Sequence, residues 1–312
     1  MTRPHRLRPP LLVLTRIWPT EERPSLGSFV KARTAGVAGV RVVSPPARRM
    51  PRVFIYASLL LNGLRVPGPI RGVEAHMIVP TGFIGLLVAR ARRVPLVVYA
   101  HGMDVWEWER PILPLRWLAR YVARHADRLV TNSEATAHDV RALGGREPIV
   151  ASPGVDLSRF TSSPRPAERR VLYLGGRDRR KGYEVAARLA DTLVGPGLED
   201  LDPDRIPELI AAHDVVLVPS LAEPFGLVAV EAIASGRWVV ANAVGGLPDI
   251  VIDGVNGTLV EDGDFAGALA RVPDYDPDVV ARTVERYSLE AWQAALERIW
   301  TEVLEARGSR SA

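Results

Sequence analysis

The chain has 312 residues, of which 47% are hydrophobic, and it carries 40 Lys or Arg against 36 Asp or Glu. This length is enough for two domains of ordinary size, each with a core of its own. The lack of cysteine excludes disulfides, thiolate nucleophiles and zinc–thiolate centres. Apolar runs stay well short of the roughly 18 residues that span a bilayer, so we expect a cytoplasmic protein.

The charge is unevenly distributed along the chain. Residues 1–160 hold 24 Lys or Arg and 11 Asp or Glu, a net charge of +13, whereas residues 161–312 hold 16 and 25, a net charge of −9. A basic half joined to an acidic half favours contact of the basic half with an anionic surface. An Arg-rich composition explains the same excess, since 38 of the 40 basic residues are Arg, and both interpretations stay open.

Short apolar runs alternate with helix-like segments through the first half. The runs are continuous and not alternating, which is typical of strands buried on both faces of a parallel sheet. The predicted strands cover residues 11–14, 40–43, 73–79, 95–100, 128–131 and 148–152. The predicted helices cover residues 28–38, 82–93, 115–125 and 133–143.

The same pattern restarts after residues 161–166, which have the composition of a linker. The second half has predicted strands at 171–174, 191–194, 214–219 and 237–241, and predicted helices at 183–190, 206–212, 225–235 and 247–252. Two such series predict an α/β protein of two Rossmann-like, doubly wound domains facing across a cleft, residues 1–160 and 161–287. A final amphipathic helix, 288–308, has no second-domain strand left to cover, so we expect it to cross back to the first domain.

The run from 220 to 236 carries the most chemistry. A buried strand delivers Glu223 into a loop, and Gly226 turns that loop into a helix. Glu231 lies a little over one turn into this helix, where it reaches a second polar group of the same ligand. The first helix amides form a natural site for phosphate or sugar oxygens, and they belong to Gly226, Leu227 and Val228. The structural alternative is that one of these glutamates stabilises the helix dipole and the other is simply solvated.

Two further clusters follow predicted strands. The run Gly175-Gly176-Arg177-Asp178-Arg179-Arg180-Lys181-Gly182 combines a glycine turn with Arg and Lys, which suits a diphosphate or, alternatively, a solvated turn. His101 begins a His-Gly-Met-Asp run, where a histidine over the cleft donates or accepts a proton unless it is structural. No pair of histidines has metal-ligand spacing, so no metal is predicted.

The run Pro219-Ser220 to Gly236, with Gly245-Gly246 after it, resembles the signature of family-4 glycosyltransferases, which are retaining enzymes of the GT-B fold. The matching positions include Glu223, Phe225-Gly226 and Glu231-Ala232. The resemblance implies that Glu223 contacts the donor sugar and that Glu231 holds the ribose of the nucleotide. It places Phe225 and the helix amides that follow it in the donor-binding set.

Weaker segments of the chain resemble other motifs of the same family. The basic turn resembles a Gly-Arg…Lys-Gly motif, which implies that Arg177 and Lys181 bind the donor diphosphate. Its spacing is one residue short, so Arg180 is a candidate for either role. The His-Gly-Met-Asp run implies that His101 lies against donor sugar and acceptor. Residues 18–30 resemble the first loop of the family, where the backbone of Gly27 touches the donor phosphate.

These residues predict a metal-independent retaining glycosyltransferase with a nucleotide diphosphate-sugar substrate, no cofactor, and Glu223 and His101 as catalytic residues. The acceptor stays open among glycans, lipids and small molecules. Only thirty-two residues separate Lys181 from Asp214, fewer than the resemblance implies, so base recognition stays open. A non-catalytic nucleotide-sugar-binding subunit and a nucleotide-sugar epimerase are the alternatives. Nucleic-acid binding is not predicted, since no binding module stands out.

Residues 111–128 predict a basic amphipathic helix. Arginines recur every fourth residue at Arg116, Arg120, Arg124 and Arg128, and a neighbouring face carries Leu115, Leu118 and Val122. Such a helix can lie in a bilayer interface, which predicts peripheral docking on an anionic membrane, at the inner face of the plasma membrane. The competing interpretation is that the apolar face packs on the parent sheet.

Overall fold

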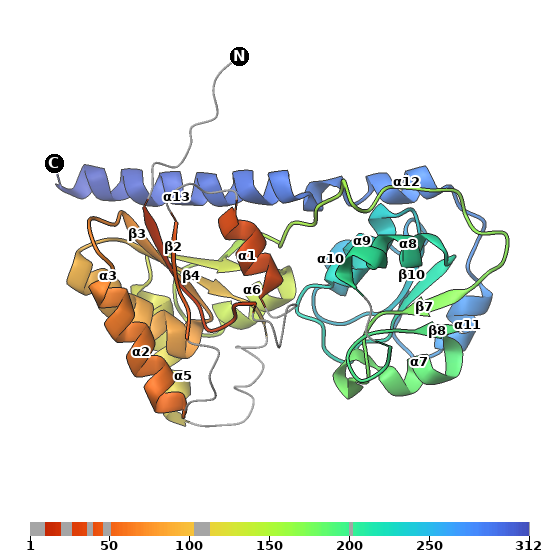
Figure 1. The fold of residues 1–312 in the computed structure, drawn as a ribbon, viewed down its shortest axis with the longest axis horizontal. Coiled ribbons are helices and arrows are strands. Elements are labelled where there is room, and N and C mark those ends of the chain that lie inside the picture. Colours follow the sequence, from red (N-terminus) through yellow and green to blue (C-terminus); the bar gives the residue numbers. More distant parts are fainter. Residues whose placement is uncertain are drawn as a thin grey trace, which may run out of the picture. The chain divides into compact units, whose positions relative to one another are not determined.

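The computed structural model describes residues 10–19, 27–35, 40–45, 51–102, 113–199 and 202–311. The chain divides into two compact units, Met1–Ala151 with Gln293–Ala312, and Ser152–Trp292 (Figure 1). The sequence placed the boundary after residue 160. The segment from Ser152 belongs to the second unit because the amide of Val155 donates to the carbonyl of Tyr287 at 2.9 Å.

The first unit is built on a 6-stranded sheet in the order β2-β1-β3-β4-β5-β6, in which every strand pair is parallel. The predicted α/β fold is thus confirmed, with each predicted strand of this half present at slightly different bounds. The strands are β1 (Leu11–Leu14), β2 (Arg41–Val43), β3 (Gly72–His76), β4 (Leu96–Ala100), β5 (Arg128–Thr131) and β6 (Ile149–Val150).

Helices cover both faces of this sheet (Figure 1). Leu12, Val73 and Val98 face a core shared with α2 (Arg52–Arg65), α3 (Phe83–Arg92) and α5 (Leu113–His125). The opposite face meets the later part of α13 (Leu289–Ser311), where Trp300 fills the space beside Gly72. The remaining helical elements are α1 (Ser28–Ala35), the π-helical turn Ile78–Gly82 and α6 (Glu134–Arg141).

The second unit is built on a 5-stranded parallel sheet in the order β11-β10-β9-β7-β8. Its strands are β7 (Val171–Tyr173), β8 (Thr192–Leu193), β9 (Val215–Val218), β10 (Trp238–Asn242) and β11 (Gly257–Val260). Its α-helices are α7 (Tyr183–Leu189), α8 (Ile206–Ala211), α9 (Leu227–Ala234), α10 (Leu247–Ile250), α11 (Phe265–Ala270) and α12 (Pro277–Arg282). Short 3-10 turns lie at Arg179–Lys181, Pro203–Arg205 and Glu285–Tyr287.

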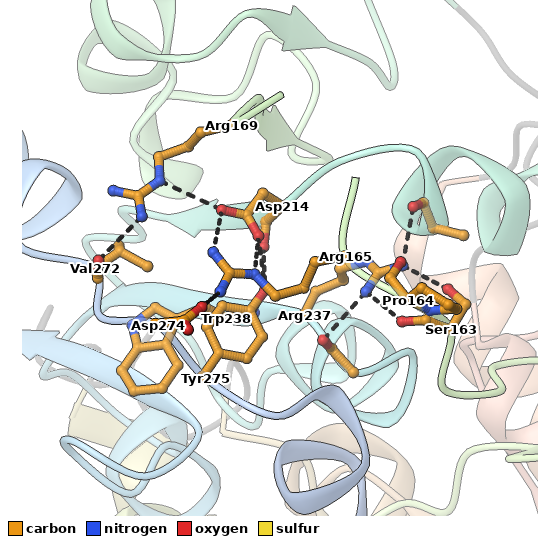
Figure 2. Close-up of polar contacts among 12 residues, drawn as sticks. Ser163, Pro164, Arg165, Arg169, Asp214, Arg237, Trp238, Val272, Asp274 and Tyr275 are labelled. Carbon is orange, nitrogen blue, oxygen red and sulfur yellow. Dashed lines mark hydrogen bonds and ion pairs between the residues drawn. The ribbon is translucent and has the colours of Figure 1, made fainter. Parts of the chain in front are cut away.

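The segment predicted as a linker is held by a buried arginine. The Arg237 guanidinium donates to the carbonyls of Ser163 at 2.9 Å, Pro164 at 3.1 Å and Ala211 at 3.0 Å (Figure 2). Because one buried side chain donates to all three carbonyls, the arginine ties residues 163–164 to the second unit.

A neighbouring cluster surrounds Asp214, which is buried. Arg165 Nε donates to its carboxylate at 2.9 Å and Tyr275 Oη at 3.0 Å, while the Arg165 guanidinium lies 4.2 Å from the Tyr275 ring centroid (Figure 2). Asp214 precedes β9 and Arg237 precedes β10, so both clusters lie at the amino ends of the strands. Ligands of such sheets bind at the carboxyl ends, and we therefore assign these contacts to stability.

We predict that Arg237→Leu destabilises the protein. Three carbonyls would lose a charged donor, at about 1–3 kcal/mol for each group left unsatisfied, so the free energy of unfolding should fall by about 3 kcal/mol or more. Urea denaturation measures this. Arg271→Leu is the matched control, since Arg271 and its ion-pair partner Asp264, at 3.3 Å, are both exposed, and the change should cost less than about 1 kcal/mol. Equally small losses in both variants would contradict the assignment.

Candidate functional site

Two loops of the second unit leave the sheet at its topological switch point. Strand β7 has β8 on one side and β9 on the other, so the connections after β7 and β9 run in opposite directions. Ligands of doubly wound sheets bind beyond the carboxyl ends of strands at such a point. The loop after β7 contains Gly175–Lys181 and the loop after β9 contains Ser220–Gly226, so the topology brings both predicted clusters to one place.

Lys181 and Glu223 meet at this switch point. Lys181 Nζ lies 2.6 Å from Glu223 Oε2, and Ser220 Oγ donates to the same oxygen at 3.1 Å. Glu223 is buried, whereas the Lys181 side chain is 37% exposed. The two residues predicted to hold diphosphate and sugar therefore form one charged pair that solvent reaches from the lysine side.

Backbone contacts fix the loop that carries Glu223. The amide of Gly246 donates to the carbonyl of Glu223 at 2.9 Å. Gly245 has φ +56°, and a Cβ there would lie 1.9 Å from that carbonyl oxygen, so only glycine fits. Asn242 Nδ2 donates to the carbonyl of Ser220 at 3.1 Å. The Gly-Gly pair thus acts by close approach to the Glu223 loop.

Gly226 starts α9 in a left-handed conformation, with φ +116°. The first amides of a helix have no intrahelical acceptor, and here they belong to Leu227 and Val228, which are both half-buried. The ring of Phe225 is buried and meets Tyr287 edge-on at 5.5 Å between centroids. Phe225 is therefore a core side chain, which leaves its backbone as the part that a donor can reach.

Glu231 lies on α9 one turn beyond these amides and is half-buried. Burial raises the pKa of its carboxyl to about 7, against a smaller lowering by the charge of Arg159. Among the described residues no side chain hydrogen-bonds to this carboxyl. A group that changes charge near neutral pH is thus part of the predicted donor site.

The cationic side chains of the basic turn, residues 177–181, have different partners. Arg180 is tied to Asp178, with Nη2 at 2.9 Å from Oδ2, and its side-chain hydrogen bond lowers the pKa of Asp178. Lys181 points to Glu223 instead. The Arg177 guanidinium lies 5.5 Å from the ring centroid of Tyr183. The geometry therefore favours Lys181 over Arg180 beside Glu223.

The shortened segment after β8 packs directly against this turn. The amide of Gly176 donates to the carbonyl of Val194 at 3.0 Å and that of Arg177 to Pro196 at 2.8 Å. A Cβ on Gly176 would lie 2.6 Å from the Pro196 carbonyl oxygen. Residues 194–197 therefore fix the backbone of the predicted diphosphate turn, even though the segment between β8 and α8 is short.

In the first unit His101 follows β4 and is linked to residues of β3. His76 Nδ1 lies 3.0 Å from His101 Nε2, and His76 Nε2 lies 3.2 Å from Glu74 Oε1. Asn132 Nδ2 donates to the carbonyl of His101 at 3.2 Å. Neither His76 nor Glu74 belongs to a motif that predicts a role from the sequence. The available signal was their spacing of two residues on a buried strand, which places both side chains on one face.

Gly27 also lies beyond a carboxyl end, that of β1. Its φ is +68°, and a Cβ would lie 2.2 Å from the carbonyl oxygen of Ile17. Its own carbonyl accepts from the amides of Val30 at 2.9 Å and Lys31 at 3.1 Å, at the start of α1. The structure therefore explains the glycine by close backbone packing. The preceding residues 20–26, and Met103 and Asp104 after His101, lie outside the described residues.

The face of α5 that we predicted to enter a membrane is internal. Val122 is buried, and Leu115 and Leu118 pack against the core of the first unit. The exposed face instead carries two aromatic residues, Trp117 and Tyr121, among the arginines. Packing on the sheet thus explains the apolar positions of α5. The arginines lie on its exposed side, together with the two aromatic residues.

No described helix is both long and apolar enough to cross a bilayer. Within the same described ranges, no three His, Asp or Glu side chains converge as metal ligands.

The sequence matches known families over both halves. A model of Glycosyltransferase Family 4 matches residues 11–159, and one of Glycosyl transferases group 1 matches residues 161–272. A D-inositol 3-phosphate glycosyltransferase of Mycolicibacterium vanbaalenii is 33% identical, covering 79% of this chain and 69% of the relative. A D-inositol 3-phosphate glycosyltransferase of Catenulispora acidiphila is 36% identical, covering 70% and 66%.

Solved structures share the fold. Sucrose-phosphate synthase from Thermosynechococcus elongatus aligns with a TM-score of 0.75 at 19% identity, covering 96% of this chain and 100% of that one. Anabaena HepE in complex with UDP and glucose aligns with a TM-score of 0.71 at 20% identity, covering 94% and 99%. The two Rossmann-like units thus have the GT-B fold. With the family models and relatives, the chain belongs to glycosyltransferase family 4.

The raised pKa of Glu231 predicts a pH-dependent stability. The folded state keeps this proton up to about pH 7, whereas the unfolded chain releases it near 4.5. The free energy of unfolding should therefore fall as pH rises between these values, by up to about 3 kcal/mol. Glu231→Gln, which cannot ionise, should flatten this window and exceed the wild type in stability at pH 8.

Urea denaturation at several pH values measures this difference. Glu184→Gln is the matched control, because Glu184 is exposed on α7 in the same unit, and it should keep the wild-type slope. A wild-type slope in Glu231→Gln as well would contradict the assignment.

Proposed function

We propose that the chain is a retaining, metal-independent glycosyltransferase that uses a nucleoside diphosphate-sugar donor. The observation that carries this proposal is the pairing of Lys181 with buried Glu223 beside the first amides of α9. A cation, a carboxylate and free amides at one switch point match the needs of a diphosphate next to a polyhydroxylated sugar.

Each group has a separate task in this proposal. Lys181, Arg177 and the amides of Leu227 and Val228 neutralise the charge that develops on the departing diphosphate, an electrostatic task that needs no metal. Glu223 orients the donor sugar through its hydroxyls and stabilises the oxocarbenium-like state. The acceptor hydroxyl attacks the face that the diphosphate leaves, and the leaving phosphate oxygen takes its proton.

In this proposal Glu231 holds the ribose of the nucleotide. The shortened segment between Lys181 and Asp214 offers fewer residues to contact the base. The ionised form of Glu231 accepts two ribose hydroxyls, so we expect nucleotide affinity to favour pH values above its pKa of about 7. His101, which follows β4 in the first unit, meets the donor sugar or the acceptor.

The relatives supply the first substrates to assay. HepE was solved with UDP and glucose, and the curated relatives are D-inositol 3-phosphate glycosyltransferases. We therefore propose UDP-sugars as first donors and inositol phosphates as first acceptors, with other acceptors screened by mass spectrometry. Transfer to an acceptor supports the enzyme, donor binding without turnover would favour a binding subunit, and donor isomerisation would favour an epimerase.

The divided tasks of Lys181 and Glu223 predict a split between binding and turnover. Lys181→Ala should weaken nucleotide binding in calorimetry by about 1.5–3 kcal/mol, the range for a hydrogen bond to a charged group. Glu223→Gln should keep nucleotide affinity and lose most turnover. Arg188→Ala, an exposed charge on α7, is the control. Full turnover of Glu223→Gln with a verified donor would refute its role.

We also propose that the first unit docks on an anionic membrane through the exposed faces of α5 and α2. Trp117 is 66% exposed on α5 and Phe54 is 58% exposed on α2, and α3 packs against both helices. Arg116 and Arg124 are exposed beside Trp117 and Tyr121. Aromatic side chains among arginines suit the boundary between lipid headgroups and acyl chains.

This surface predicts binding to vesicles that contain phosphatidylglycerol and none to pure phosphatidylcholine, with loss at high salt. Replacing Arg116 and Arg124 by Gln should weaken binding roughly thirtyfold, since each charge adds about 1 kcal/mol near an anionic surface. Co-sedimentation measures this. The double variant R188Q/R205Q removes the same charge from the second unit and should bind normally. Equal binding of both double variants would overturn the proposed surface.

A further inference from the structure

One peptide of the basic turn is held on both sides by the protein. Tyr173 Oη donates to the carbonyl of Gly176 at 3.0 Å, and across the same peptide the amide of Arg177 donates to the carbonyl of Pro196 at 2.8 Å. We propose that Tyr173 is a positioning residue of the donor site, which fixes this peptide and thereby the direction in which the Arg177 side chain leaves the backbone. The contact of Arg177 with a diphosphate rests on the proposed function, whereas the held peptide does not.

The hydroxyl of Tyr173 is enclosed beneath the turn and keeps its proton. Tyr173 ends β7 and is buried. Burial, followed by the charge of Asp178, raises the pKa of this hydroxyl above its usual value, so it remains a donor. A Cβ on Gly175 would lie 2.2 Å from Oη, so glycine at this position leaves the space that the hydroxyl occupies. Among the described residues, the carbonyl of Gly176 is the one hydrogen-bond partner of this hydroxyl.

The peptide needs a contact on each side because the residue before it is a glycine. Gly176 has φ +64°, and its lack of a Cβ gives its backbone more freedom to rotate than any other residue would have. Without the hydroxyl of Tyr173, the buried carbonyl of Gly176 would lose its donor, which favours rotation of the peptide toward another donor or water. Such a rotation would change the backbone of Arg177 and move its side chain.

Arg177 depends on its backbone because little else holds its side chain. The side chain is exposed, and among the described residues its guanidinium forms no ion pair and has one aromatic neighbour, Tyr183, at 5.5 Å from the ring centroid. An exposed arginine loses rotamer freedom when it binds an anion. A fixed backbone direction reduces the number of conformations that are lost on binding, which favours affinity.

Lys181, the other predicted diphosphate ligand, is held by separate contacts. Its Nζ lies 2.6 Å from Glu223 Oε2, and its amide donates to the carbonyl of Asp178 at 3.1 Å. Neither contact involves the peptide that Tyr173 holds. Loss of the Tyr173 hydroxyl should therefore weaken the contact of a diphosphate with Arg177 and leave its contact with Lys181 unchanged.

Amide hydrogen exchange of the nucleotide-free full chain, followed by NMR, tests the held peptide. The Arg177 amide should be protected in the wild type and, relative to the amides of β9, should exchange roughly fivefold faster in Tyr173→Phe, the factor expected for one hydrogen bond. Tyr275→Phe is the matched control, because it removes a hydroxyl that donates to Asp214 at 3.0 Å, at the amino ends of the same strands. The control should leave the relative exchange of Arg177 unchanged. An Arg177 amide that exchanges freely in the wild type, or unchanged exchange in folded Tyr173→Phe, would overturn the proposal.

Calorimetry with UDP tests whether Tyr173 acts through Arg177. Tyr173→Phe should weaken UDP binding roughly fivefold, both in the wild-type background and in Lys181→Ala. In the Arg177→Ala background the same change should have less than a roughly twofold effect, because residues that act through one contact are not additive. Tyr275→Phe should bind UDP normally. An equal loss in the Arg177→Ala background would assign Tyr173 to the fold in general and would overturn its positioning role.

If Tyr173→Phe does not fold, the wild type still decides the matter. A hydroxyl proton bonded to a buried carbonyl exchanges slowly enough to give its own NMR signal, so we expect such a signal for Tyr173, together with the protected Arg177 amide. Rapid exchange of that proton would overturn the proposal. The exchange measurements need no nucleotide, so a wild type that binds neither UDP nor GDP and transfers no sugar would refute the proposed function alone.

Discussion

The contact between Lys181 Nζ and Glu223 Oε2 at 2.6 Å is the interaction around which the second unit is arranged. Its partners come from the connections after β7 and β9, which approach each other only because β7 and β9 are neighbours in a parallel sheet. A buried carboxylate costs free energy unless it is paired and hydrogen-bonded. Lys181 and Ser220 supply these contacts, and Gly246 fixes the backbone from which the carboxylate projects.

The two edges of this sheet have opposite physical characters. At the amino edge, Arg237 and Asp214 form hydrogen bonds with carbonyls and neighbouring side chains of the protein (Figure 2). At the carboxyl edge, Lys181 is partly exposed and Glu231 has a raised pKa. Buried polar groups that are hydrogen-bonded within the protein stabilise a fold, whereas groups with perturbed pKa values at the carboxyl edge are candidates for chemistry. The polar groups at the two edges of this sheet are therefore suited to different tasks, stability at the amino edge and the proposed function at the carboxyl edge.

Continuous apolar strands are the signal that made both sheets predictable, as at Val215–Val218, because a strand buried on both faces needs no alternation. The sequence did not predict helix α2, because its apolar residues include both buried Leu59 and exposed Phe54 and therefore do not mark one buried face at helical spacing. Composition alone predicts a linker at residues 161–166 but does not show that a distant Arg237 binds the carbonyls of residues 163 and 164. Motifs identified Lys181 and Glu223 separately, but their pairing depends on strand order, which the sequence does not display.

Each unit places a carboxylate between one cation and one neutral donor, and burial decides what that carboxylate can do. Glu223 lies at the end of a strand, next to half-exposed Lys181, where a ligand can reach the pair. Glu74 lies within a strand, fully buried, and Trp300 Nε1 donates to it at 3.0 Å, so solvent does not reach its carboxylate. A carboxylate two residues earlier on a strand than a histidine shares its face, so Glu74 Oε1 and His76 Nε2 meet at 3.2 Å. Position along the strand thus separates a carboxylate that solvent approaches through its partner from one that is enclosed in the core.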